Sequence, residues 1–117
     1  IDFLLEEHPE DTRPAWVVVM SVTLAEGKLA RFPDSVTERG RKHAMTLASL
    51  AVSGARSALL FVVQRADCDR VEPADDIDPA YGAALREAVS RGVEVLAVGA
   101  RVSPSSIRVE GALPVLL

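Results

Sequence analysis

The chain has 117 residues, which is enough for one domain with a hydrophobic core and too short for two ordinary domains. Hydrophobic residues make up 49% and charged residues 26%, as in an ordinary globular protein, and the net charge of −4 gives no general attraction to nucleic acid. Its single cysteine, Cys68, rules out an internal disulfide, and neither a membrane span nor a signal peptide is visible, so we expect a soluble cytoplasmic protein.

The chain begins with a short apolar run, "IDFLLE" at residues 1–6, which predicts a strand. It has no initial methionine and starts directly inside this run, so we expect a piece of a longer protein. The next stretch, "EHPEDTRP", has two prolines and several acidic residues, which indicate a surface loop.

The second predicted strand is "WVVVMSVTL", residues 16–24. Side chains alternate along a strand, so Val18 and Met20 share one face while Val17 and Val19 share the other. Both faces are apolar, which is typical of a strand buried on both sides. The glycine turn in "AEGK" and the following "LARF" then predict a hairpin.

Two helices are predicted by their start and stop signals. Ser35 or Thr37 can cap a helix that runs to about Ser53 and stops at Gly54. Asp78 caps the second helix, with Pro79 at its first position and Gly92 at its end.

The remaining strands complete the predicted fold. "SALLFVVQR", residues 57–65, is the best candidate for a central parallel strand, and "VEVLAVGARV", residues 93–102, is the next strand. The tail is expected to be a loop or short turn with a final extended segment. This order predicts an α/β fold with a mixed central sheet flanked by helices, in one domain of residues 1–117.

Several stretches carry a family resemblance: "IDFLLE", "SVTLAEGKLARFPDSVTERGRKH", "LLFVVQRAD", "PADDIDPAYGAALREAVSRGVEVLA" and "LPVLL". Together they resemble the C-terminal domain of the sugar fermentation stimulation proteins, SfsA. The resemblance implies a restriction-endonuclease-like core of the PD-(D/E)xK nuclease type, with DNA as the expected partner. Members of the family also carry an OB-like N-terminal domain, so we expect that domain, and the helix and strand that open the core, to be missing here.

The resemblance also implies catalytic positions. In the family the second strand carries a Glu and a Lys that act with the Asp of the first strand. Asp2 matches, whereas Val18 stands in place of the Glu and Met20 in place of the Lys. The family fold implies Mg²⁺, which prefers carboxylate oxygens, so Asp2 is at best a weak, vestigial metal ligand and no strongly bound cofactor is expected. As an alternative, Asp2 is simply a strand-end carboxylate in water.

Nucleic-acid binding is expected from Arg39, Lys42, His43 and Arg65, although a charged helix face is usually only solvated. Gln64 ends a buried strand, where open α/β sheets place their sites, and is the remaining candidate for the catalytic cleft. Asp75, Asp76 and Asp78 lack the glycine and glutamate spacing of a calcium loop, and Cys68 is expected to be a free thiol in a loop.

Three functions remain open at this point. The first is a nuclease-like domain that binds nucleic acid without catalysis, a pseudoenzyme. The second is a metal-dependent phosphodiesterase with substitute ligands, and the third is a protein-interaction or regulatory module of sugar metabolism. We further expect the first two strands to be antiparallel neighbours, with Asp2 facing Val18 and Met20, and a bare sheet edge that favours a homodimer.

Overall fold

The computed structural model describes residues 3–5 and 15–117. In this part of the chain, strands and helices follow the order β1 (Phe3–Leu5), β2 (Ala15–Val22), β3 (Leu24–Glu26), β4 (Leu29–Phe32), α1 (Glu38–Val52), β5 (Arg56–Val63), β6 (Arg70–Pro73), α2 (Pro79–Ser90), β7 (Glu94–Ser103) and β8 (Ser106–Leu113).

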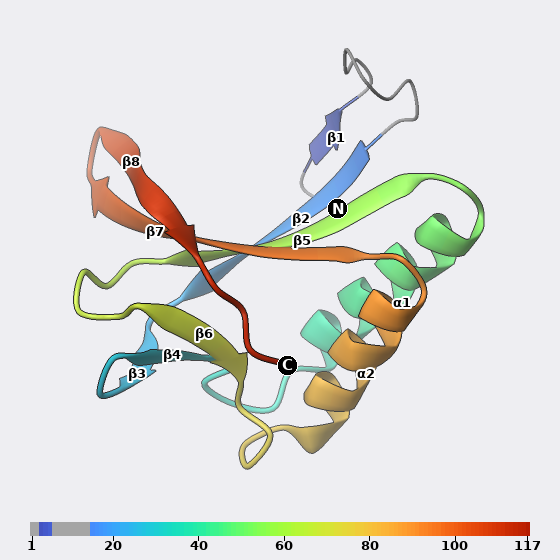
Figure 1. Ribbon diagram of the computed structural model, residues 1–117, viewed down its shortest axis with the longest axis horizontal. Coiled ribbons are helices and arrows are strands. Elements are labelled where there is room, and N and C mark those ends of the chain that lie inside the picture. Colours follow the sequence, from blue (N-terminus) through green and yellow to red (C-terminus); the bar gives the residue numbers. More distant parts are fainter. Residues whose placement is uncertain (1–2, 6–14) are drawn as a thin grey trace.

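A five-stranded sheet forms the centre of the fold, in the order β1-β2-β5-β7-β8. β5 is central and runs parallel to both neighbours, β2 and β7, while β1 and β8 are antiparallel at the two edges. A smaller sheet has the order β3-β4-β6. The predicted mixed sheet, with the strand after α1 at its centre, is therefore confirmed. Figure 1 shows α1 and α2 side by side on one side of the large sheet.

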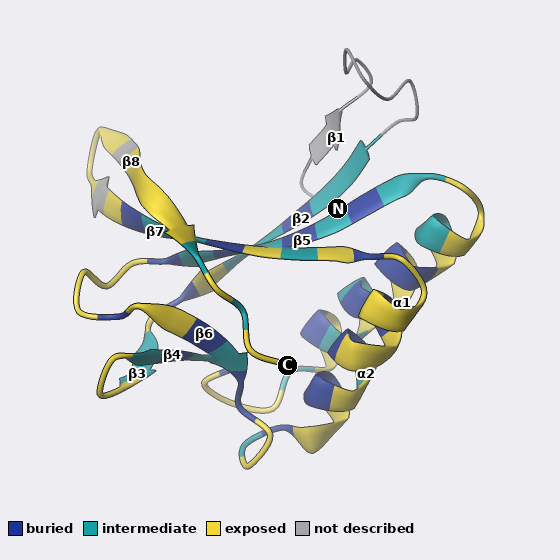
Figure 2. Ribbon diagram, in the orientation of Figure 1, coloured by how far each residue is buried: buried dark blue, intermediate teal, exposed yellow. Residues whose placement is uncertain are grey.

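The core lies between that sheet, the helices and the small sheet. Val18 and Val22 of β2 are opposite Leu59 and Val63 of β5, and all four are buried. They pack in one cluster with Leu47 and Ala44 of α1, Leu85 and Tyr81 of α2, and Ala30 and Val71 of the small sheet. Figure 2 shows buried positions alternating with exposed positions along both helices, as expected for helices with one face against the core.

The other face of the large sheet is only partly covered. Val17 and Leu60 are half-buried and Leu96 is 50% exposed, and these side chains border a cavity of about 320 Å³. The apolar pattern of β2 predicts burial on both faces; Val18 and Val22 on one face are buried, whereas Val17 and Val19 on the other are only half-buried. The reason is that both helices pack on the same side of the sheet, so apolar side chains on the second face remain accessible.

The helix signals in the sequence are confirmed. The Gly40 N–H donates to Thr37 Oγ1 at 3.0 Å, so Thr37 rather than Ser35 caps α1, which ends at Val52 with Ser53 as its C-cap. The Asp78 side chain caps α2, and Pro79 is its first residue. Gly54 and Gly92 follow the two helices with positive φ angles of 99° and 106°, a backbone conformation that favours glycine.

The hairpin, β6 and β8 each differ from the sequence prediction. The predicted hairpin around Gly27 forms between β3 and β4, but it belongs to the small sheet. β6 completes that sheet by pairing with β4, and nothing in its four residues marks a strand. The tail is expected to be a loop or short turn with a final extended segment, whereas residues 106–113 form the strand β8, because a tight turn folds them back onto β7.

Candidate functional site

The first two strands meet as expected. β1 pairs antiparallel with β2, with Phe3 opposite Val17 and Leu4 opposite Trp16, which confirms the predicted neighbours within Phe3–Leu5. Asp2 lies outside the described residues, so its position facing Val18 and Met20 stays a prediction. The described residues of the candidate site come from β2, α1 and the end of β5.

Val18 and Met20 are part of the hydrophobic packing. Val18 is 1% exposed, and Met20 is half-buried on the same face, opposite Phe61 of β5. Neither side chain has an atom that ligates a hard cation. Residues 3–5 and 15–117 contain no group of three or more His, Cys, Asp or Glu side chains able to hold a metal ion. The side chains present at Val18 and Met20 thus do not fit the magnesium centre that the family resemblance implies.

The first two turns of α1 carry a cluster of cations. Arg39 and Lys42 are exposed, are three residues apart, and share a face with the half-buried His43. Neither Arg39 nor Lys42 forms an ion pair with any residue that the structure describes. We refer to Arg39, Lys42 and His43 as the α1 basic cluster. Its two exposed cations keep their charge available for an external anion.

Gln64 lies at the carboxyl end of β5, at some distance from this cluster. Its side-chain amide donates to Ser21 Oγ, and its backbone N–H donates to Val22 O at 3.1 Å. Ser21 follows Met20 in β2 and therefore points to the opposite face of the sheet. The structure thus places Gln64 beside Ser21 rather than on the face that holds Val18 and Met20.

Arg65 follows Gln64 and is paired within its own loop. Its Nη2 lies 2.7 Å from Asp67 Oδ2 and its Nε lies 3.0 Å from Asp67 Oδ1, a two-point ion pair. The hydrogen bond raises the pKa of Arg65 and lowers the pKa of Asp67. Figure 1 shows the loop after β5 at one end of the large sheet and α1 toward the other. The four predicted nucleic-acid residues therefore form two groups, the α1 basic cluster and Arg65.

Cys68 lies in the same loop and is buried. Burial raises the pKa of its thiol, with a smaller contribution from the carboxylate of Asp67, whose Oδ1 is 3.8 Å from Sγ. The thiol form is thereby favoured over the reactive thiolate. The prediction of a free thiol agrees with the structure. The Cys68 side chain is buried, although it lies in a loop.

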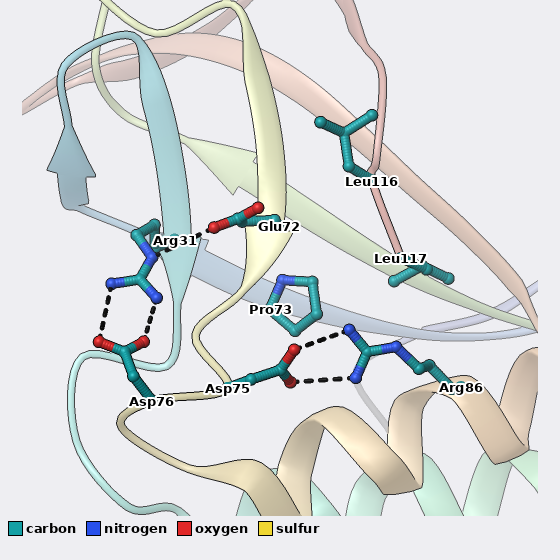
Figure 3. A pocket seen from close by; sticks show the side chains of 8 residues that line it. All are labelled: Arg31, Glu72, Pro73, Asp75, Asp76, Arg86, Leu116 and Leu117. Atoms are coloured by element: carbon teal, nitrogen blue, oxygen red, sulfur yellow. Dashed lines mark hydrogen bonds and ion pairs between the residues drawn. The ribbon is translucent and has the colours of Figure 1, made fainter.

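Acidic residues before α2 form internal ion pairs (Figure 3). Arg86 donates from Nη1 and Nη2 to the two oxygens of Asp75, at 3.0 and 2.8 Å. Arg31 pairs with Asp76, and its Nε lies 3.5 Å from Glu72 Oε1. These side chains line a cavity of about 460 Å³ beside Leu116 and Leu117. Sequence reasoning missed this network because its partners come from three separate elements.

Taken together, the sheet order and the helix positions define an α/β domain with a restriction-endonuclease-like fold. The family described as "Sugar fermentation stimulation protein RE domain" matches residues 1–106. The chain belongs to this family. Neither of the helices in the described part of the chain has the length and apolar character needed to cross a bilayer.

Individual relatives agree with this assignment. The sugar fermentation stimulation protein homolog of Geobacter metallireducens is 51% identical over 117 residues, which cover 100% of this chain and 49% of that protein. The homolog of Roseobacter denitrificans is 49% identical over 118 residues, again covering 100% of this chain and 49% of the relative. The chain spans about half the length of the curated relatives it matches.

A solved structure is similar as well. Pyrococcus furiosus SfsA, determined in complex with Ca²⁺, aligns with a TM-score of 0.82 and 31% sequence identity. The alignment covers 89% of this chain and 46% of that protein. The fold expected from the sequence is therefore confirmed by an experimentally determined relative.

Proposed function

We propose that residues 1–117 form a single nuclease-like domain that binds nucleic acid, with DNA as the expected ligand, and has lost catalysis. The observation that carries the proposal is Val18, which is 1% exposed and stands where the family resemblance expects a metal-binding Glu. A lone buried cysteine agrees with a cytoplasmic location, where thiols remain reduced.

The loss of catalysis follows from the chemistry of phosphodiester cleavage. A magnesium-dependent nuclease needs carboxylates that hold the cation against the phosphate and a positive charge near the attacking water or the developing negative charge. Val18 and Met20 supply neither a ligand nor a charge. The Pyrococcus furiosus protein was determined with Ca²⁺, and we propose that this chain binds divalent cations weakly in comparison.

Binding is proposed through local contacts, because the overall charge of −4 repels polyanions. Arg39 and Lys42 are exposed and have no ion-pair partner among the described residues, so they can approach phosphates without breaking an internal interaction. Each phosphate contact releases counterions from the nucleic acid, so the affinity should depend strongly on salt.

A salt-dependent titration tests the binding. Fluorescence anisotropy of a labelled, mixed-sequence DNA duplex should give a log–log salt slope that is negative for the wild-type chain over about 50 to 200 mM salt. In the Arg39→Ser, Lys42→Ser variant the slope should become less negative by about 1.8, or about 0.9 for each lost phosphate contact. Arg91→Ser is the control, because Arg91 is paired with Glu87 at the far end of α2.

Absence of DNA binding in this assay would contradict the proposal and would favour a protein-interaction or regulatory module. That second candidate is supported by the acidic net charge and by the accessible apolar face around Val17, Leu60 and Leu96.

Calorimetry with Mg²⁺ and Mn²⁺ tests the loss of the metal centre. The Val18→Glu, Met20→Lys variant restores a carboxylate and a cation and should bind either metal more tightly than the wild-type chain. Val17→Glu is a matched control, because it places a carboxylate on the other face of the same strand. Equal metal affinity of the double variant and the wild-type chain would show that positions 18 and 20 do not belong to a metal site. Metal-dependent nicking of DNA by the wild-type chain would instead support an active phosphodiesterase with substitute ligands.

A further inference from the structure

The outer half of the β7–β8 hairpin is a two-stranded ribbon that leaves the sheet. β5 pairs with β7 only as far as Val63 opposite Gly99, so residues 100–103 pair with β8 alone. We refer to residues 100–103 and 106–109 as the β7–β8 ribbon. Figure 1 shows this ribbon projecting beyond the rest of the large sheet. The two strands hydrogen-bond to each other, and no other strand in the described part of the chain pairs with the outer side of either.

The backbone bends where the β7–β8 ribbon leaves the large sheet. The register shifts between Gly99 and Ala100, so that Gly99 is opposite Gly111 and Ala100 is opposite Val109, with Glu110 as the extra residue. Such a bulge increases the local twist and redirects the strand. Gly111 has a φ angle of 155°, which fits a distorted backbone at this bend. The ribbon is therefore turned away from the core by its own backbone.

Among the ribbon side chains that the structure describes, only Ala100 is buried, at 8% exposed. Arg101, Ser103, Ser106, Arg108 and Val109 are all exposed, and Figure 2 shows the hairpin coloured largely as exposed. A two-stranded ribbon is only marginally stable in water. A ribbon whose described polar side chains are all exposed is suited to contact another molecule.

The register gathers the polar side chains of the ribbon on one face. Arg101 is opposite Arg108, and Ser103 is opposite Ser106, two residues further along the strand, so alternation places all four on the same side. Like charges placed directly opposite each other destabilise a strand pair. One carboxylate, Glu110, lies 3.1 Å from Arg101 Nε. Arg108 has no ion-pair partner among the described residues, so the face retains a positive charge with two hydroxyl groups beside it.

The base of the ribbon adjoins residues that the sequence already indicated. Arg101 and Glu110 line a cavity of about 240 Å³ together with Gln64, and Arg65 lines a neighbouring cavity of about 220 Å³ with Gly111. The loop that carries Arg65 and the β7–β8 ribbon therefore lie at the same end of the large sheet, away from α1 (Figure 1).

We propose that the cationic face of the β7–β8 ribbon contacts the phosphates of a DNA duplex, next to Arg65 and separately from the α1 basic cluster. This inference rests on the proposed function, since it assigns a second contact to the same ligand. A two-stranded ribbon fits the major groove, which is about 12 Å wide, and arginine and serine side chains are common phosphate contacts.

The ribbon is tested with the same labelled duplex and the full chain. Arg101→Ser, Arg108→Ser should lower the affinity at about 100 mM salt at least about tenfold, and should make the salt slope less negative by about 1.8. Arg101→Lys, Arg108→Lys retains both charges and should keep most of the affinity. Arg70→Ser removes a charge already paired with Asp69 and should behave like the wild-type chain.

A second measurement needs no substitution. Addition of the duplex should shift the backbone amide NMR signals of residues 103 and 105–108 in the wild-type chain, which would support the ribbon contact even if a variant folded poorly. Wild-type binding with unchanged ribbon signals and an unaffected serine variant would overturn the ribbon contact, while sensitivity to Arg39→Ser, Lys42→Ser would leave the proposed function intact. Absence of binding by the wild-type chain would overturn both. Loss of self-association rather than of DNA binding in the serine variant would show that the ribbon is a strand-pairing edge.

Discussion

Asp78 is a buried carboxylate that joins the starts of two helices. It is 4% exposed, and its Oδ1 accepts a hydrogen bond from the Tyr81 N–H at 3.0 Å while Oδ2 accepts one from the Thr37 N–H at 2.9 Å. We expect Asp78→Ala to lower the free energy of unfolding by about 2 kcal/mol, because a helix cap is lost and a second buried N–H is left without its acceptor. Urea denaturation measures the change.

Asp34→Ala is the control for this substitution, because Asp34 is an exposed carboxylate in the segment that leads into α1. It should change the free energy of unfolding by no more than about 0.5 kcal/mol. Equal stability of the two variants would mean that the bonds made by Asp78 are replaced by water.

Tyr81, unlike Asp78, carries a buried polar group that has no hydrogen-bond partner among the described residues. Its ring packs edge-on against Phe32 at a centroid distance of 5.3 Å, and its hydroxyl makes no hydrogen bond to the described residues. Burial, together with the nearby carboxylate of Asp78, raises the pKa of this hydroxyl far above its usual range. We expect Tyr81→Phe to leave stability unchanged or to increase it by about 1 kcal/mol, because an unsatisfied polar atom is removed from the core. A clear loss of thermal stability would reveal a hydrogen bond to the hydroxyl.

A third prediction at the residue scale concerns Val18. Because Val18 is 1% exposed and packs in the core, a lone Glu there would be a buried, unpaired charge. Val18→Glu should therefore destabilise the chain by about 3 kcal/mol or more, and addition of Met20→Lys should recover part of that loss by pairing the charge. The wild-type chain should fold at least as well as the double variant. Urea unfolding of the wild-type chain, the single variant and the double variant gives their order of stability. A double variant more stable than the wild-type chain would contradict the prediction.

At the scale of elements, ion pairs connect β4, β6 and α2. Arg31 lies in β4, Glu72 in β6 and Arg86 in α2, while Asp75 and Asp76 lie between β6 and α2. Hydrogen bonds from Arg86 and Arg31 lower the pKa of Asp75 and of Asp76, respectively. A carboxyl group with a lowered pKa in the folded state stabilises the fold above its unfolded pKa, near 3.9, and this contribution disappears as the pH falls through the folded value.

We therefore expect the Asp75→Asn, Asp76→Asn variant to be less stable than the wild-type chain at pH 7, and the difference to close as the pH falls below about 4. Both carboxylates are exposed, although Arg31 is only 13% exposed, so the difference should also shrink in high salt. Urea midpoints at several pH values measure both effects. A difference that stayed constant from neutral to acidic pH would show that the asparagines act through packing rather than through charge.

At the scale of the whole molecule, the accessible sheet face predicts self-association, which we propose as a homodimer. Leu96 is 50% exposed and lies beside Val17 and Leu60 at the border of a cavity, and apolar surface of this kind favours association. Leu96→Lys should raise the dissociation constant of such a dimer at least about tenfold, since burial of one leucine contributes about 1.5 to 3 kcal/mol. Light scattering over a concentration series measures the constant.

Lys substitution of Val109 is the control, because Val109 is similarly exposed but lies on the β7–β8 ribbon. A wild-type chain that remains monomeric at high concentration would contradict the homodimer. A dimer that only the Val109 substitution weakens would place the interface on the ribbon.

The local elements were determined by the sequence to a large extent, because their signals act over a few residues. Thr37 and Asp78 cap the two helices with their own side chains, glycines end both, and the apolar run of β5 becomes the central strand. The sequence also shows Val18 and Met20 at the two positions where the family resemblance leads one to expect a Glu and a Lys, since this depends only on which residues occupy one strand.

Only the tertiary structure decided which surfaces these elements share. β6 and β8 are strands because distant segments supply their hydrogen-bond partners, which no local pattern encodes. The separation of Arg65 from the α1 basic cluster, and its position near the arginines of the β7–β8 ribbon, depend on how β5, α1 and β7 are arranged. The half-covered sheet face has the same origin, because an apolar residue has the same local pattern whether or not another layer covers it.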